Sequence, residues 1–157
     1  MLLRGAEGNE LELAIAGYQF PDEERDPWDS NALLVAVRVL APEGTWSVVD
    51  PCLTTWEAQH LVSWLVHAAG REPSPAPITF SEPNLTVTAR SVAGAPHRVQ
   101  VRASFALELR PPWARTAAGS DHLTVDVEVG RGDLARAAAS LLDDLAQFPQ
   151  RGADPTL

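Results

Sequence analysis

Alternation of apolar and polar side chains over residues 99–109, interrupted only at Ala106, is the feature that most limits how this chain can fold. A β-strand points successive side chains to opposite faces, so a period of two predicts a strand with one buried and one hydrated face. The residues expected to face the core are Val99, Val101, Ala103, Phe105, Leu107 and Leu109.

Further strands are indicated along the rest of the chain. Alternation marks residues 11–15, 85–89 and 123–129, and a nearly continuous apolar run over 33–40 is typical of a central strand. Turn residues at 41–44 join that run to 45–49 as a hairpin, which we expect Asp50 and Pro51 to end. Short turns between consecutive strands favour antiparallel pairing.

Two amphipathic helices are expected, over about 54–69 and 133–148. Thr54 and Glu57 have the spacing of a capping box, and Gly70 and Pro149 follow the two helix ends. We expect Glu57 on the polar face with His60, Ser63 and His67. The expected buried stripes are Ala58, Leu61, Val62, Leu65 and Ala69 in the first helix and Leu134, Ala137, Ala138, Leu141, Leu142 and Leu145 in the second.

These elements predict an α+β fold: an antiparallel sheet of about six or seven strands with the two helices packed on one face. The length of 157 residues suits one domain, which we expect over residues 1–149, with 150–157 as a loose C-terminal tail. In the core we expect Val101, Phe105, Leu107, Leu123, Val125, Leu141 and Leu145 to pack together.

Composition excludes some classes of function. The net charge is −9, and residues 1–57 carry 11 acids against 3 arginines, which argues against a nucleic-acid partner. No apolar run approaches the ~20 residues of a membrane span, and the first five residues do not resemble a signal peptide. A lone cysteine, Cys52, cannot form an internal disulfide, so we expect a cytoplasmic protein.

The chain carries no recognisable catalytic motif. Cys52 precedes a helix start, where a thiol can be activated, but no histidine is placed beside it, and a buried structural cysteine is the favoured interpretation. The four histidines, His60, His67, His97 and His122, lack metal-ligand spacing. We therefore expect no catalytic residue, cofactor or metal. An enzyme with an unrecognised site and a homo-oligomeric scaffold remain as alternatives.

The densest charge lies in the polar loop 22–31, between two expected strands. No glycine is present and Pro27 intervenes, so a calcium loop is not indicated. Trp28 is either a plug over the core or an anchor for a partner, and the acids either solvate the loop or dock a basic protein. The candidate partner-binding residues are Tyr18, Asp22, Glu23, Glu24, Asp26, Trp28 and Asp29.

Several loop segments, spread from about residue 10 to residue 149, resemble one family of small bacterial proteins. They are residues 17–21, Trp46, residues 50–54 with Trp56 and Glu57, residues 80–85, 111–113 and 148–149. Together they resemble the immunity proteins of the wall-associated-protein type, the WapI-like immunity family. The resemblance implies a cytoplasmic antitoxin that binds and blocks the toxin domain of a polymorphic secreted toxin, and it assigns no binding residues.

Overall fold

The strands form two antiparallel sheets of four strands each in this computed structural model, which describes residues 1–70, 75–115 and 121–156. The first sheet contains β1 (Leu2–Arg4), β2 (Glu10–Tyr18), β3 (Ala32–Ala41) and β4 (Gly44–Thr54), and the second contains β5 (Ile78–Thr79), β6 (Leu85–Val92), β7 (Ala95–Ala106) and β8 (His122–Gly130). The helices are α1 (Pro27–Asn31), α2 (Thr55–Ala69), α3 (Pro112–Arg115) and α4 (Arg131–Gln147), with a 3₁₀ turn η1 (Leu107–Leu109). The expected α+β class is confirmed, although the strands divide between two sheets instead of sharing one.

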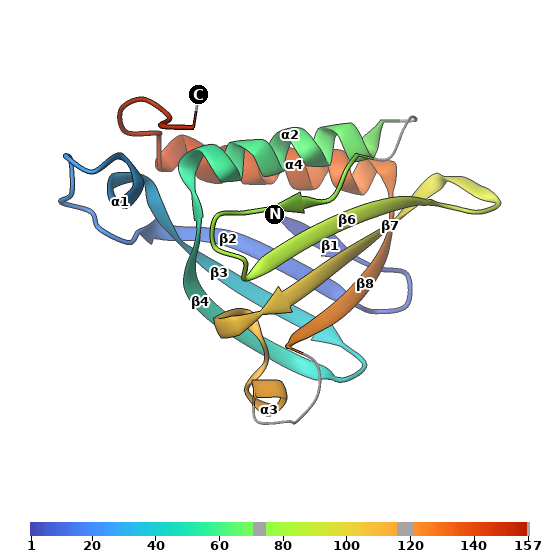
Figure 1. Cartoon of the computed structure of the whole chain (residues 1–157). Coiled ribbons are helices and arrows are strands. Elements are labelled where there is room, and N and C mark those ends of the chain that lie inside the picture. The colour runs from blue at the N-terminus through green and yellow to red at the C-terminus, as the bar shows by residue number, and fades with distance from the viewer. Residues whose placement is uncertain (71–74, 116–120, 157) are drawn as a thin grey trace.

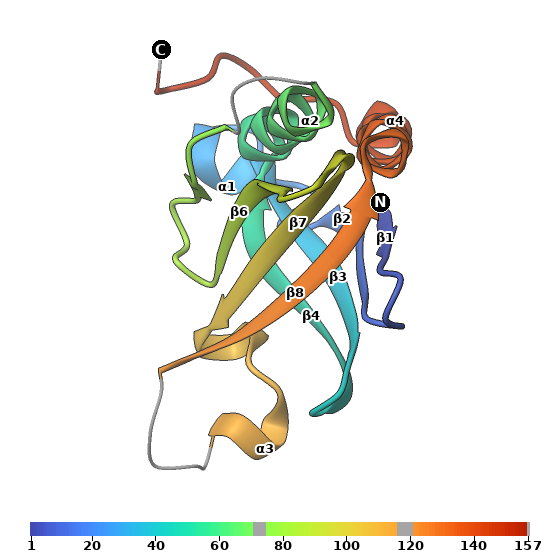
Figure 2. The ribbon, with the colours of Figure 1, turned by 90° about the vertical axis from the view of Figure 1, so that its right-hand side faces the viewer.

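Each half of the chain has the same plan. Strands β1 to β4 follow one another in sequence across the first sheet and lead into α2, and β5 to β8 do the same across the second sheet and lead into α4. Figure 1 shows α2 and α4 side by side, and Figure 2 shows the two sheets crossing below them. The helices thus cover an open side that the two sheets share.

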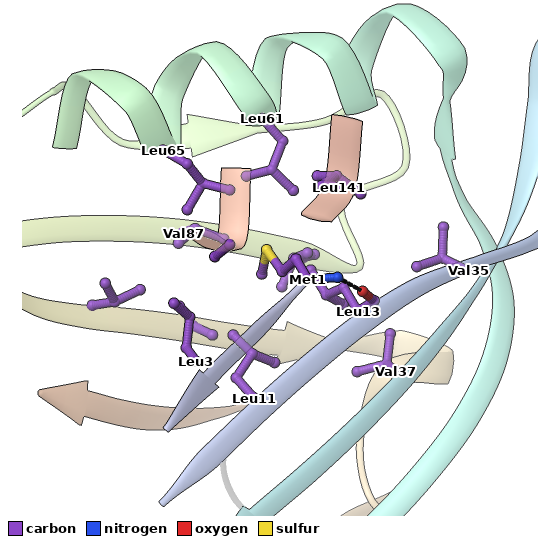
Figure 3. Packing of buried hydrophobic residues seen from close by; sticks show 14 of the residues in the cluster. Met1, Leu3, Leu11, Leu13, Val35, Val37, Leu61, Leu65, Val87 and Leu141 are labelled. Atoms are coloured by element: carbon purple, nitrogen blue, oxygen red, sulfur yellow. Dashed lines mark hydrogen bonds between the residues drawn. The ribbon is translucent and has the colours of Figure 1, made fainter. Parts of the chain in front are cut away.

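The core lies between the two sheets and beneath the two long helices. Leu11, Leu13 and Val35 point inward from the first sheet and meet Leu61 of α2 and Leu141 of α4 (Figure 3). Val101, Phe105, Val125, Leu141 and Leu145 are buried as expected, and Leu123 is partly buried against them.

Leu107 does not belong to this core, contrary to the expectation from the alternating pattern. Strand β7 ends at Ala106, and Leu107 begins the 3₁₀ turn with a φ of 47° and a side chain that is 51% exposed. Alternation continues in the sequence beyond the point where the backbone leaves the sheet, so the pattern alone places the strand end too late.

Strand β4 continues through Asp50 and Pro51 to Thr54, whereas the sequence predicted a break there. The strand lies at the edge of its sheet, and its pairing with β3 shifts register between Leu33 and Val35, opposite these residues. A proline lacks an N–H to donate, but an edge strand with an irregular register tolerates it.

The expectations did not include β1, α1 or α3. The three residues of β1 pair with β2 but are too few to show a period. Helix α1 lies inside the expected loop 22–31, where the Asp26 side chain accepts hydrogen bonds from the backbone N–H groups of Trp28 and Asp29 and caps a helix that Pro27 begins.

The capping box at the start of α2 is confirmed, but Glu57 is buried and does not lie on the polar face. Its carboxylate accepts hydrogen bonds from Thr54 N at 2.8 Å and, with the other oxygen, from Ser81 N at 2.6 Å. In α4, Leu142 is exposed, because the side of the helix that meets the core is the one carrying Leu141 and Leu145.

We predict that Phe105→Ala lowers the free energy of unfolding by about 3–5 kcal/mol, because Phe105 is fully buried and its ring packs edge-on against Trp46. Leu107→Ala in the exposed turn should cost no more than about 0.5 kcal/mol. Urea denaturation of both variants measures the difference. Similar losses for the two would mean that Leu107 also contributes to the core.

Candidate functional site

The strongest candidate for a functional site is the segment of residues 19–31 between β2 and β3, here called the α1 loop. Two of its acids have structural roles. Glu23 Oε1 accepts hydrogen bonds from the backbone N–H groups of residues 24, 25 and 26, at 3.0, 2.7 and 3.2 Å. The bond from Arg25, followed by that from Asp26, lowers the pKa of the Glu23 carboxyl. Asp26 caps α1, so these two carboxylates hold the loop in shape.

The other three acids of the α1 loop point to solvent. Asp22, Glu24 and Asp29 are exposed. Among the residues that the structure describes, none forms an ion pair or hydrogen bond with these three carboxylates. Their charge is therefore available to a partner.

Trp28 is held at the loop surface by a second tryptophan. Its side chain is 40% exposed, and its ring meets Trp56 edge-on at a centroid distance of 5.2 Å. Trp56 is buried, so part of the Trp28 side chain packs against a buried residue and part is exposed to solvent. Phe20 in the same loop is also exposed. The loop thus presents two aromatic side chains among unpaired acids, the composition of an interface anchor.

The chain after α4 returns to the α1 loop, as Figure 1 shows. The Arg151 guanidinium donates to the carbonyl oxygens of Pro21 at 2.9 Å and Glu23 at 3.3 Å, and lies 3.7 Å above the Tyr18 ring centre. The Tyr18 hydroxyl donates to the Pro149 carbonyl. Tyr18, a candidate partner-binding residue, therefore contacts the C-terminal segment.

Asn31 joins this segment to the loop and to α2. Its Nδ2 donates to the Arg151 carbonyl at 2.7 Å, and its Oδ1 accepts from Arg151 N at 2.8 Å and from Thr55 Oγ1 at 2.7 Å. Residues 150–157 were expected to be a loose tail, but at Arg151 the chain is attached to the loop. Neither Asn31 nor Arg151 was among the candidate residues, and no local pattern marks a contact across 120 positions.

A cleft of about 680 Å³ lies between the α1 loop and the C-terminal segment. Proline side chains of both segments line it together with Ser30, Glu24, Arg25 and Arg151. The Ser30 hydroxyl donates to the Pro27 carbonyl at 3.3 Å and not to Glu24, so the described residues of the cleft show no nucleophile bonded to a general base.

The comparison with protein families places most of the chain in one family. A model of the immunity protein WapI-like family matches residues 1–149. The chain belongs to the WapI-like immunity protein family. No curated protein matches it. Arg151, which holds the α1 loop, lies outside the residues that the family model matches.

Other groups considered for chemistry in this family member are dispersed or buried. Within residues 1–70, 75–115 and 121–156, no three histidine, cysteine, aspartate or glutamate side chains are grouped as metal ligands would be. No helix in these ranges is long and apolar enough to span a bilayer. If the α1 loop were only a plug over the core, the sequence would offer a second docking face on the polar side of the strands, formed by Glu10, Glu12, Arg38 and Arg102. The structure does not place these four residues on one face, because Glu10, Glu12 and Arg38 lie on the first sheet and Arg102 on the second.

Cys52 is fully buried, and desolvation, reinforced by the charge of Asp50, raises the pKa of its thiol to about 12. At pH 8 the thiolate fraction is then on the order of 10⁻⁴. We predict that a thiol reagent leaves the folded protein unmodified at pH 8 and labels it stoichiometrically in urea. Labelling of the folded protein as fast as a free thiol peptide would contradict this assignment.

We predict that Arg151→Ala accelerates amide hydrogen exchange in the α1 loop while α2, α4 and the sheets keep their protection. The reason is that the variant removes the guanidinium that bonds loop carbonyls, and the core is not touched. Arg136→Ala, which removes an exposed arginine from α4, is the matched control. Unchanged loop exchange in Arg151→Ala would show that Asn31 and the acidic caps hold the loop alone.

Proposed function

We propose that this protein neutralises a toxin domain by direct contact, and that the α1 loop docks on a basic surface of that toxin. The observation that carries the proposal is that the five acids of the loop have two different roles. Glu23 and Asp26 shape the loop, while Asp22, Glu24 and Asp29 remain exposed and unpaired within the described chain. Membership of an immunity family supports a toxin as the partner.

The acids and the tryptophan contribute to different steps of binding. Exposed carboxylates attract a basic partner over a range set by salt, about 8 Å at physiological ionic strength, so they act mainly on the association rate. Trp28 adds a rigid ring that a pocket can desolvate, so it acts mainly on dissociation. If the toxin is a nuclease, occupying its basic phosphate-binding site would block it without any catalysis by this chain. We propose that this chain is not an enzyme and that it acts in the cytoplasm.

The substitutions Asp22→Asn, Glu24→Gln and Asp29→Asn, made together, should slow association with the proposed toxin domain by about tenfold at low salt. The fold should be retained, because none of the three side chains bonds within the described protein. Stopped-flow or surface-based kinetics across a salt series measures the effect.

The matched control neutralises Glu43, Glu82 and Asp143, which are exposed elsewhere on the chain. It changes the net charge equally. If both triple variants slow association to the same extent, the overall charge and not the α1 loop attracts the partner, and the docking assignment is wrong.

Trp28→Ala should raise the dissociation rate and weaken binding by about 30-fold, equivalent to about 2 kcal/mol. Trp113→Ala is a close control, since Trp113 is 44% exposed and meets buried Trp46 edge-on at 5.8 Å. Equal losses of affinity in the two variants, or no loss in Trp28→Ala, would remove the tryptophan from the interface.

A further inference from the structure

The outer face of the first sheet combines apolar side chains with balanced charge. Register pairing places Ala14 of β2, Ala36 of β3 and Val49 of β4 in one row across three strands, on the side away from the core. Val49 is 56% exposed. It is the one large hydrophobic side chain of the described strands that is so exposed, since the other exposed ones lie in loops, turns and helices.

Within this row, Val49 projects from the sheet beside a depression. A depression of about 470 Å³ is lined by Ala14, Ala36, Val49 and their neighbours. The two alanines leave space on β2 and β3, while Val49 stands up on β4. A face that carries both a projection and a matching hollow can be complementary to itself.

The charge of this face allows a second copy to approach without net repulsion. Glu10 pairs with Arg4 at 3.0 Å, and Arg38 lies 3.8 Å from both Glu10 and Glu12. These four side chains sum to zero in a chain whose net charge is −9. Two copies repel one another through most of their surface, but here they meet without net repulsion and with each charge already paired within its own copy.

We propose that the outer face of the first sheet, defined by Ala14, Ala36, Val49 and the ion-paired residues around them, binds a second copy of this chain. A two-fold axis running along β3 between the copies brings β4 of one over β2 of the other. Val49 of each copy then enters the hollow at the second copy's Ala14. This face is separate from the α1 loop, so the inference goes beyond the proposed toxin binding and does not depend on it.

Sedimentation velocity of the full chain over about 1 µM to 1 mM tests the proposal, because the small apolar row predicts a weak dimer. Val49→Glu should raise the dimer dissociation constant about tenfold or more, since it places an unpaired carboxylate in the contact. Val66→Glu is the matched control, because Val66 is 58% exposed on α2 and the charge change is the same. A monomer at every concentration, or equal effects of the two variants, overturns the proposal.

Salt and crosslinking distinguish this contact from other associations. Raising salt should strengthen the dimer by screening the repulsion between two acidic copies, whereas it should weaken docking of a basic toxin. Position 36 lies next to the proposed axis, and the native Cys52 is buried. A short bis-maleimide reagent should therefore link two copies of Ala36→Cys across the gap of about 10 Å between packed sheets, while it should not link copies of Ser63→Cys on α2. Dimers that crosslink equally at both positions, or that weaken with salt, would place the contact elsewhere.

Discussion

One buried carboxylate links the two halves of the structure. Glu57 accepts the Thr54 N–H and hydroxyl hydrogen bonds with one oxygen and the Ser81 N–H bond with the other. It therefore fixes the end of β4, the start of α2 and the segment that leads into β6. A buried charge is stable only when its lone pairs are satisfied, so these three places hold one another in register.

Local chemistry in the sequence predicts elements better than it predicts their grouping. The periods of β7 and β8 and the Thr54–Glu57 capping box are local, and the structure contains them. Whether the strands share one sheet or form two depends on whether an edge of the β1–β4 sheet pairs with an edge of the β5–β8 sheet. No local pattern in the sequence indicates this pairing. Leu107 shows the same limit, because its side chain fits the alternation while its backbone has already left the strand.

Sequence reasoning located the charged loop but not its internal organisation. Five acids within a few residues look equivalent in a sequence, and only the backbone donors around them separate Glu23 and Asp26 from the rest. Arg151 contributes from the far end of the chain, beyond the residues that the family model matches. The loop that we propose for recognition is thus shaped partly by a residue outside the stretch that the family model matches.

The repeated plan of strands followed by a helix has a consequence for how the chain can be assembled. Each half pairs its strands with sequence neighbours, so the strand ladders of its sheet are complete without the other half, but its apolar face stays uncovered. A chain cut between α2 and β5 would give two peptides. Each would contain the strands and the long helix of one half and would leave its apolar face exposed. Mixing them should restore the native molecule by fragment complementation, with the hydrophobic core serving as the intermolecular interface.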